Sequence, residues 1–188
     1  MGQIKAIITD FDGTLVFTKE ANTKAYQEAC KLCGYEFDAD KYKNEAFGLR
    51  FNEMCDYVGI PQEIREKVKE LKKKVYPKYF NYLELNLPLF LTLIRFHNEG
   101  VKTCIASTAS KENLNNVLKY LDIEDIFDYV ITGEDVKHGK PDPEVYLKAL
   151  EKCECNPEDA VIYEDSEVGF KAAEAANVKY ISVNQNYE

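Results

Sequence analysis

The chain has 188 residues, of which 24 are lysine or arginine and 33 are aspartate or glutamate, giving a net charge of −9. This acidic balance argues against nucleic acid or an anionic membrane as a partner, because both require a basic face on the protein. It allows a small phosphorylated metabolite, since a metal ion and a lysine can reverse the charge locally.

The first predicted element is a buried strand over residues 6–9, which runs directly into Asp10 and Asp12. Two carboxylates at the end of a buried strand are costly unless positive charge offsets them. The stretch Asp10-Phe11-Asp12-Gly13-Thr14 therefore raises the question of what supplies that charge. Asp-Gly is also common turn chemistry, so a solvated turn is the alternative interpretation.

The segment from residue 16 to residue 85 has a different character. Its apolar spacing predicts helices over 20–33, 41–58 and 62–82. No strand pattern interrupts these helices. We therefore expect an all-helical insert between the first strand and the rest of the chain.

The remaining chain alternates strands with helices. Strand patterns occur at 101–106, 129–132, 160–163 and 180–183, and helical patterns at 113–121, 144–151 and 166–176. Apolar strands separated by helices are typical of a parallel sheet covered on both faces. The expected fold is α/β: a doubly wound parallel sheet formed by residues 1–15 and 86–188, with a helical cap domain over 16–85.

Four short stretches stand at predicted strand ends, where such sheets bind ligands. They are D-F-D-G-T (10–14), I-A-S-T (105–108), H-G-K-P-D-P (138–143) and V-I-Y-E-D-S (161–166). Together they supply carboxylates, a hydroxyl and an ammonium. Carboxylates favour Mg²⁺, a lysine and a hydroxyl favour a phosphoryl group, and a carboxylate can attack that group as a nucleophile.

Simpler structural roles exist for several of these residues. Ser107 or Ser110 could cap the following helix, Lys140 could be a surface lysine before a proline, and one of Glu164 and Asp165 could cap the helix that follows. Each role accounts for one stretch alone. The presence of all four stretches favours a shared site.

The four motifs in this order resemble the haloacid dehalogenase (HAD) superfamily. The similarity rests on D-F-D-G-T-L, the strand-end Ser107, G-K-P-D-P and Y-E-D-S-x-x-G, and it extends over the whole chain. The most similar subgroup carries a helical cap after the first motif and includes β-phosphoglucomutase and phosphoglycolate-phosphatase-like enzymes. The resemblance implies a Rossmann-like core and a cap that closes over it.

The resemblance also implies a role for each motif residue. Asp10 would be the nucleophile and Asp12 the general acid and base. Ser107, with the backbone at Thr108, would bind the transferring phosphoryl group, and Lys140 would neutralise charge between that group and the nucleophile. An acid at the position of Asp12 speaks against dehalogenation.

The implied cofactor is Mg²⁺. Its ligands would be the second oxygen of Asp10, the backbone carbonyl of Asp12 and the carboxylate of Asp165. Glu164 would stand beside them, either as a further ligand or as a support for one.

Substrate choice is expected to lie in the cap. Arg50, in Gly48-Leu49-Arg50, stands where mutase-like members carry an arginine for the distal phosphate, although a surface arginine explains it equally well. Two positions depart from the mutase pattern: Asn22 replaces a histidine, and Phe17 replaces an acid. These departures weaken a mutase reaction and leave hydrolysis untouched.

We therefore predict a Mg²⁺-dependent phosphatase that hydrolyses a small phosphomonoester through an aspartyl-phosphate. The alternatives are a sugar-phosphate mutase of the β-phosphoglucomutase type and, from another class, a phospho-ligand-binding protein without turnover. No signal pattern precedes the first strand, and the apolar stretch 85–94 is too short to span a bilayer. A cytoplasmic monomer whose six cysteines are reduced is the default expectation.

Overall fold

The computed structural model describes residues 3–184, and the chain forms two compact units. The first unit contains the residues up to Phe17 and those from Leu85 onward, and the second is Thr18–Glu84. Residues 1–2 and 185–188, which the predicted core domain includes, lie outside the described residues. The first unit is called the core unit below, and the second the cap unit.

The core unit is built on a five-stranded sheet in the order β5-β4-β1-β6-β7. The strands are β1 (Ala6–Thr9), β4 (Lys102–Ala106), β5 (Tyr129–Ile131), β6 (Ala160–Glu164) and β7 (Lys179–Ser182). Every neighbouring pair is parallel, which confirms the predicted parallel sheet. Each strand lies within two residues of its predicted position.

The central strand β1 determines where a ligand site can form. All four of its residues are buried, and Thr9 is paired with Ile105 on β4 and with Tyr163 on β6. The chain fills the sheet on one side of β1 with β4 and β5 before it crosses to β6 and β7 on the other. This reversal of strand order next to β1 is the point at which open α/β sheets bind ligands.

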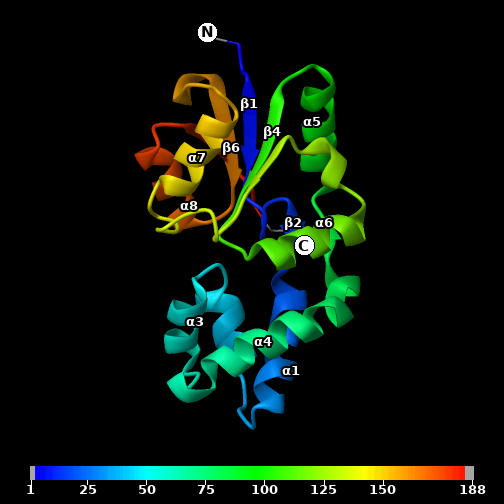
Figure 1. Cartoon of the computed structure of the whole chain (residues 1–188), viewed down its shortest axis with the longest axis vertical. Helices are drawn as coiled ribbons and strands as arrows, with labels where there is room; N and C mark the ends of the chain where they lie inside the picture. The colour runs from blue at the N-terminus through cyan, green and yellow to red at the C-terminus, as the bar shows by residue number, and fades with distance from the viewer. Residues whose placement is uncertain (1–2, 185–188) are drawn as a thin grey trace. The chain divides into compact units, whose positions relative to one another are not determined.

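Helices cover both faces of the sheet, as a doubly wound fold requires. They are α5 (Leu87–Asn98), α6 (Lys111–Leu121), α7 (Glu144–Lys152) and α8 (Glu167–Ala175). Figure 1 shows α7 and α8 on one side of the strands and α5 and α6 on the other. On the α7–α8 side, apolar residues of both helices pack against β1, β4 and β6 in one buried cluster.

A serine stands at the N-cap of two of these helices, and the two serines differ. Ser166 is the N-cap of α8, and its Oγ accepts a hydrogen bond from the backbone N–H of Gly169 at 3.1 Å. Ser110 stands at the N-cap of α6 but makes no capping bond with its side chain. Among the described side chains, Ser110 Oγ is a buried oxygen without a hydrogen-bond partner.

Helix α5 was not predicted, because the stretch 85–94 had been considered only as an apolar run. Asn86 starts the helix: its Oδ1 accepts from Leu89 N at 3.2 Å, and Pro88 occupies the first turn. The Asn86 side chain also donates through Nδ2 to Thr14 O at 2.9 Å. One buried side chain therefore begins the helix and holds the loop that follows β1.

The cap unit is mainly helical. Its elements are α1 (Lys19–Leu32), α2 (Ala39–Lys41), the π-helical turn η1 (Tyr42–Ala46), α3 (Phe51–Val58), the 3₁₀ turn η2 (Gln62–Ile64), α4 (Arg65–Val75) and the 3₁₀ segment η3 (Tyr76–Tyr82). Tyr26, Phe37 and Tyr42 pack ring against ring in its buried cluster, with centroids 5.4 to 5.7 Å apart.

Two of the predicted cap helices are not continuous. The helix expected over 41–58 is broken between η1 and α3, where Gly48 has a φ of +86° and Arg50 is extended. A φ in this region is readily adopted by glycine and ends helical hydrogen bonding. The helix expected over 62–82 is α-helical only to Val75, because Pro77 lacks an N–H and the chain tightens into η3.

The insert over 16–85 was expected to be all-helical, but a short strand lies at each of its ends. The two-residue strands β2 (Val16–Phe17) and β3 (Glu84–Leu85) pair with each other where the chain leaves the core unit and returns to it. Within residues 3–184, no helix combines the length and apolarity that a membrane span needs.

Replacing Asn86 by alanine tests the anchoring of the loop after β1. The change removes two buried hydrogen bonds and leaves Thr14 O and Leu89 N unpaired, so we expect the free energy of unfolding to fall by about 1–3 kcal/mol. Urea-induced unfolding measures this loss. Asn98→Ala, at the exposed end of the same helix, is the matched control; an equal effect of the two changes would contradict the assigned role.

Candidate active site

Asp10 is held at the end of β1. Its backbone N–H donates to Tyr163 O at 2.9 Å, which continues the β1–β6 pairing by one residue, and the residue is only 7% exposed. The chain then turns: Gly13 has a φ of +95° and donates to Val16 O at 2.8 Å. Asp12 is half-buried in this turn, and its backbone forms an isolated β-bridge with that of Val16. The turn interpretation of Asp-Gly is therefore correct for the backbone, while Asp10 itself is buried.

Lys140 supplies the positive charge that the paired aspartates require. Its Nζ lies 2.6 Å from Asp10 Oδ1 and 2.6 Å from Glu164 Oε2, and its side chain is only 6% exposed. Burial lowers the pKa of Lys140, but the negative charges of Asp10 and Glu164 raise it well above its usual range. The ammonium therefore stays charged between two carboxylates. A surface role for Lys140 is excluded by this burial.

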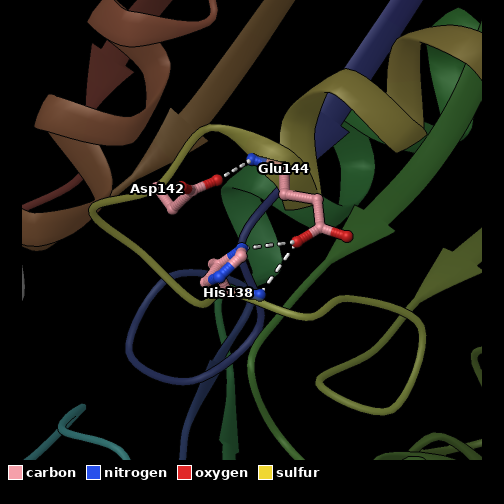
Figure 2. A group of neighbouring side chains, drawn as sticks. All are labelled: His138, Asp142 and Glu144. Carbon is pink, nitrogen blue, oxygen red and sulfur yellow. Dashed lines mark hydrogen bonds and ion pairs between the residues drawn. The ribbon is translucent and has the colours of Figure 1, made fainter.

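The loop that carries Lys140 is anchored at the start of α7. Figure 2 shows His138, Asp142 and Glu144 facing one another there. Glu144 Oε2 accepts from the backbone N–H groups of Lys137 and His138 at 2.9 and 2.8 Å, and Glu144 N donates to Asp142 Oδ1 at 2.9 Å. The two backbone donors lower the pKa of Glu144 to about 2. The carboxylate is thus a fixed anchor for the loop at neutral pH.

Glu164, at the end of β6, accepts five hydrogen bonds and is 1% exposed. Its Oε2 accepts from Lys140 Nζ and from the hydroxyl of Tyr146. Its Oε1 accepts from Ser166 Oγ at 2.9 Å and from the backbone N–H groups of Asp165 and Ser166 at 3.1 Å each. Burial raises the pKa of Glu164, but Lys140 and these donors bring it below its usual value.

Asp165 lies beside Glu164 and is held by Thr14, whose Oγ1 donates to Asp165 Oδ1 at 2.7 Å. Carboxylate oxygens of Asp10, Glu164 and Asp165 all lie within 4.8 Å of one another. Burial raises the pKa of Asp10 well above its usual range; Lys140 opposes the shift, and Glu164 and Asp165 add to it. Three carboxylates facing one ammonium leave an excess of negative charge. Such an oxygen-only donor set fits a hard divalent cation such as Mg²⁺.

Ser107 follows β4, the strand next to β1. It is buried, its backbone N–H donates to Ile131 O at 3.0 Å, and its Oγ accepts from Ala109 N at 3.0 Å. Thr108 is half-buried, and its carbonyl packs against Gly133: a β-carbon at Gly133 would lie 2.5 Å from Thr108 O. This close approach fixes the backbone after Ser107.

The predicted residues therefore fall into groups. Asp10, Lys140, Glu164 and Asp165 form one connected cluster, and Ser107 and Thr108 follow the neighbouring strand. Arg50 belongs to the cap unit, where it is exposed at the N-cap of α3.

Thr14, Gly133 and Tyr146 contact predicted site residues but were not themselves predicted. Thr14 is part of the first motif, so its position was a usable signal. Gly133 directly follows a predicted strand, which also marks it as a strand-end position. Tyr146 has an apolar helix spacing that is typical of a core residue and gives no sign of a polar contact.

Fold and site together define the class of protein: a doubly wound α/β protein with a buried ammonium among acids at the carboxyl end of its central strand. A family model described as haloacid dehalogenase-like hydrolase matches residues 7–183. The chain belongs to this family of hydrolases, which confirms the resemblance drawn from the four motifs.

Individual relatives agree with this assignment. The chain is 30% identical over 182 residues to a phosphorylated carbohydrates phosphatase of Thermotoga maritima, covering 95% of this chain and 84% of that protein. The crystal structure of a β-phosphoglucomutase from Clostridium difficile is 25% identical with a TM-score of 0.81, covering 97% of this chain and 85% of that one.

The same fold occurs in CbbY from Rhodobacter sphaeroides, which was crystallised in complex with phosphate. That structure has a TM-score of 0.86 and 23% identity, and it covers 99% of this chain and 90% of that one. The likeness extends over the whole chain, so the cap unit as well as the core unit has counterparts in solved structures.

Gly169→Ala tests the packing that holds Glu164. A β-carbon at Gly169 would overlap the carboxyl group of Glu164. Replacing a helical glycine by alanine gains about 1 kcal/mol of helix propensity, but overpacking a buried site costs about 1–3 kcal/mol. The displaced carboxylate would also lose some of its five hydrogen bonds, so we expect a net loss of stability, measured by denaturant unfolding.

The matched control for this change is Lys171→Ala on the exposed face of the same helix. It changes helix propensity without contact to Glu164 and should leave the free energy of unfolding within about 0.5 kcal/mol of the original. A Gly169→Ala variant that is as stable as the original chain would mean that Glu164 has room to move.

Proposed function

We propose that the protein is a Mg²⁺-dependent phosphatase that hydrolyses a small phosphomonoester through an aspartyl-phosphate on Asp10. The observation that carries the proposal is the contact of Lys140 Nζ with Asp10 Oδ1 at 2.6 Å, beside a group of close carboxylates. A buried carboxylate whose charge is offset by a fixed ammonium is a suitable covalent nucleophile for a phosphoryl group.

The carboxylates of Asp10 and Asp165, with the backbone carbonyl of Asp12, would hold Mg²⁺, and Glu164 stands beside them as a further ligand or a support. Bound there, the ion supplies charge neutralisation and polarisation of the phosphoryl oxygens. Thr14 keeps the carboxylate of Asp165 oriented through its hydrogen bond. The excess of negative charge around Asp10 supports a site for a cation.

In the first step, a carboxylate oxygen of Asp10 attacks phosphorus and the bond from phosphorus to the ester oxygen breaks. Asp12 gives a proton to the leaving oxygen, so an alcohol departs and the phosphoryl group remains on Asp10. Lys140 offsets the charge on the transferred group. The hydroxyl of Ser107 and the backbone N–H at Thr108 donate to its oxygens, which favours the charge distribution of the transition state.

In the second step, Asp12, now a carboxylate, accepts a proton from water as the water oxygen attacks phosphorus. The bond between phosphorus and Asp10 breaks, which releases inorganic phosphate and restores both aspartates. Lys140 stays paired with Asp10 and Glu164 when the phosphoryl group leaves, so the nucleophile returns to the same position for the next cycle.

The proposed substrate class is a small phosphorylated metabolite, and a phosphorylated carbohydrate is the first choice because the Thermotoga maritima relative acts on that class. A mutase reaction is the second candidate, because a β-phosphoglucomutase is among the relatives and because Arg50 resembles the arginine that mutase-like members carry for the distal phosphate. Asn22, in place of a histidine, disfavours it. We also propose a cytoplasmic monomer that requires no nucleic acid or membrane partner.

The direct test is phosphate release from sugar phosphates, nucleoside monophosphates and phosphoglycolate, with Mg²⁺ and after its removal by EDTA. We expect release that depends on Mg²⁺ and that falls by about a thousandfold or more in Asp10→Asn, which lacks the nucleophile. Asp125→Asn removes an exposed carboxylate outside the site and should leave the rate unchanged.

Two outcomes would contradict this proposal. Release that persists in Asp10→Asn would exclude Asp10 as the nucleophile. Conversion of β-glucose 1-phosphate to the 6-phosphate without release of phosphate, and only with a bisphosphate activator, would identify a mutase instead.

A further inference from the structure

Tyr146 is a buried residue of α7 that the proposed reaction does not use. It is 0% exposed and packs in the cluster between α7, α8 and the sheet. A buried tyrosine hydroxyl needs a hydrogen-bond partner. Here the hydroxyl donates to Glu164 Oε2, the same carboxylate oxygen that accepts from Lys140.

The ring of Tyr146 makes a second contact with the same pair. Lys140 Nζ lies 4.9 Å from the centroid of this ring, within the range of a cation–π interaction. One side chain therefore contacts the ammonium with its ring and the partner carboxylate of the ammonium with its hydroxyl. These contacts restrict both where Lys140 lies and which way Glu164 points.

The rest of Glu164 is fixed from the opposite side. Its Oε1 accepts from Ser166 Oγ and from two backbone N–H groups, and its carboxyl group packs directly over Gly169. The orientation of the carboxylate is thus set at one end by the start of α8 and at the other by Lys140 and Tyr146. Without the tyrosine hydroxyl, Oε2 would compete more strongly for the ammonium and draw it away from Asp10.

We propose that Tyr146 is a positioning residue, which holds the ammonium of Lys140 on Asp10 by fixing Glu164 with its hydroxyl and Lys140 with its ring. As a statement about catalysis, this rests on the proposed function. As a statement about Lys140, it rests on the contacts alone and can be tested without turnover.

Tyr146→Phe removes the hydroxyl and keeps the ring, so the core volume is retained. Tyr180→Phe is the matched control, because it removes another tyrosine hydroxyl of the core unit, one that donates to Glu174 at 3.3 Å. The first readout is the exchange of lysine ammonium protons with water, followed by ¹H–¹⁵N NMR. The Lys140 signal is assigned by its absence in Lys140→Met.

We expect the Lys140 protons to exchange several-fold faster in Tyr146→Phe and at the original rate in Tyr180→Phe. An unchanged rate in Tyr146→Phe would overturn the inference, whatever the kinetics show. A Lys140 signal that already exchanges too fast to observe in the original protein would also overturn it, because the ammonium would then not be fixed.

The second readout is turnover. We expect kcat of Tyr146→Phe to fall about tenfold with little change in KM, since a displaced ammonium affects the reacting group more than binding. Tyr180→Phe should match the original protein, and equal losses in the two variants would overturn the catalytic part. If the original protein releases no phosphate, the proposed function fails, and the exchange measurement still decides whether Tyr146 positions Lys140.

Discussion

The ion pair of Lys140 with Asp10 and Glu164 is the interaction on which the site depends. Removing an ammonium and two carboxylates from water costs free energy, and only close contacts in good geometry offset this cost. Lys140 lies 130 residues after Asp10 and 24 residues before Glu164 in the chain. The end of β1, the loop before α7 and the end of β6 must therefore meet. The sheet order, with β6 next to β1, provides this meeting point.

The two carboxylates that share Lys140 are in unequal surroundings. Glu164 accepts five hydrogen bonds, and its pKa is lowered even though it is buried. Asp10 shares the same ammonium, but burial raises its pKa, and the negative charges of Glu164 and Asp165 raise it further. Glu164 is therefore suited to hold Lys140 in place, whereas the negative charge around Asp10 is left for a cation to compensate. Two acids that share one lysine are thus suited to different roles because their surroundings differ.

The sequence predicts what depends on local pattern. The apolar runs identified all five strands of the sheet, and the position of acids directly after those runs identified Asp10, Glu164 and Asp165. The expected helices continue through Gly48 and Pro77 because the apolar spacing does, although glycine and proline are the residues that most often end a helix. Tyr146 was missed for a related reason: its apolar spacing agrees with its burial, and its hydrogen bond joins residues 18 positions apart.

Ser166 shows why local structure and the site are not separable in this fold. Its Oγ accepts from Gly169 N, which caps α8, and donates to Glu164 Oε1, which orients the carboxylate beside Lys140. A hydroxyl can do both because it carries one donor and two acceptor sites. The cap that begins the helix is therefore also part of the chain of contacts from Ser166 through Glu164 and Lys140 to Asp10. A residue that caps a helix thus also helps to orient the candidate nucleophile.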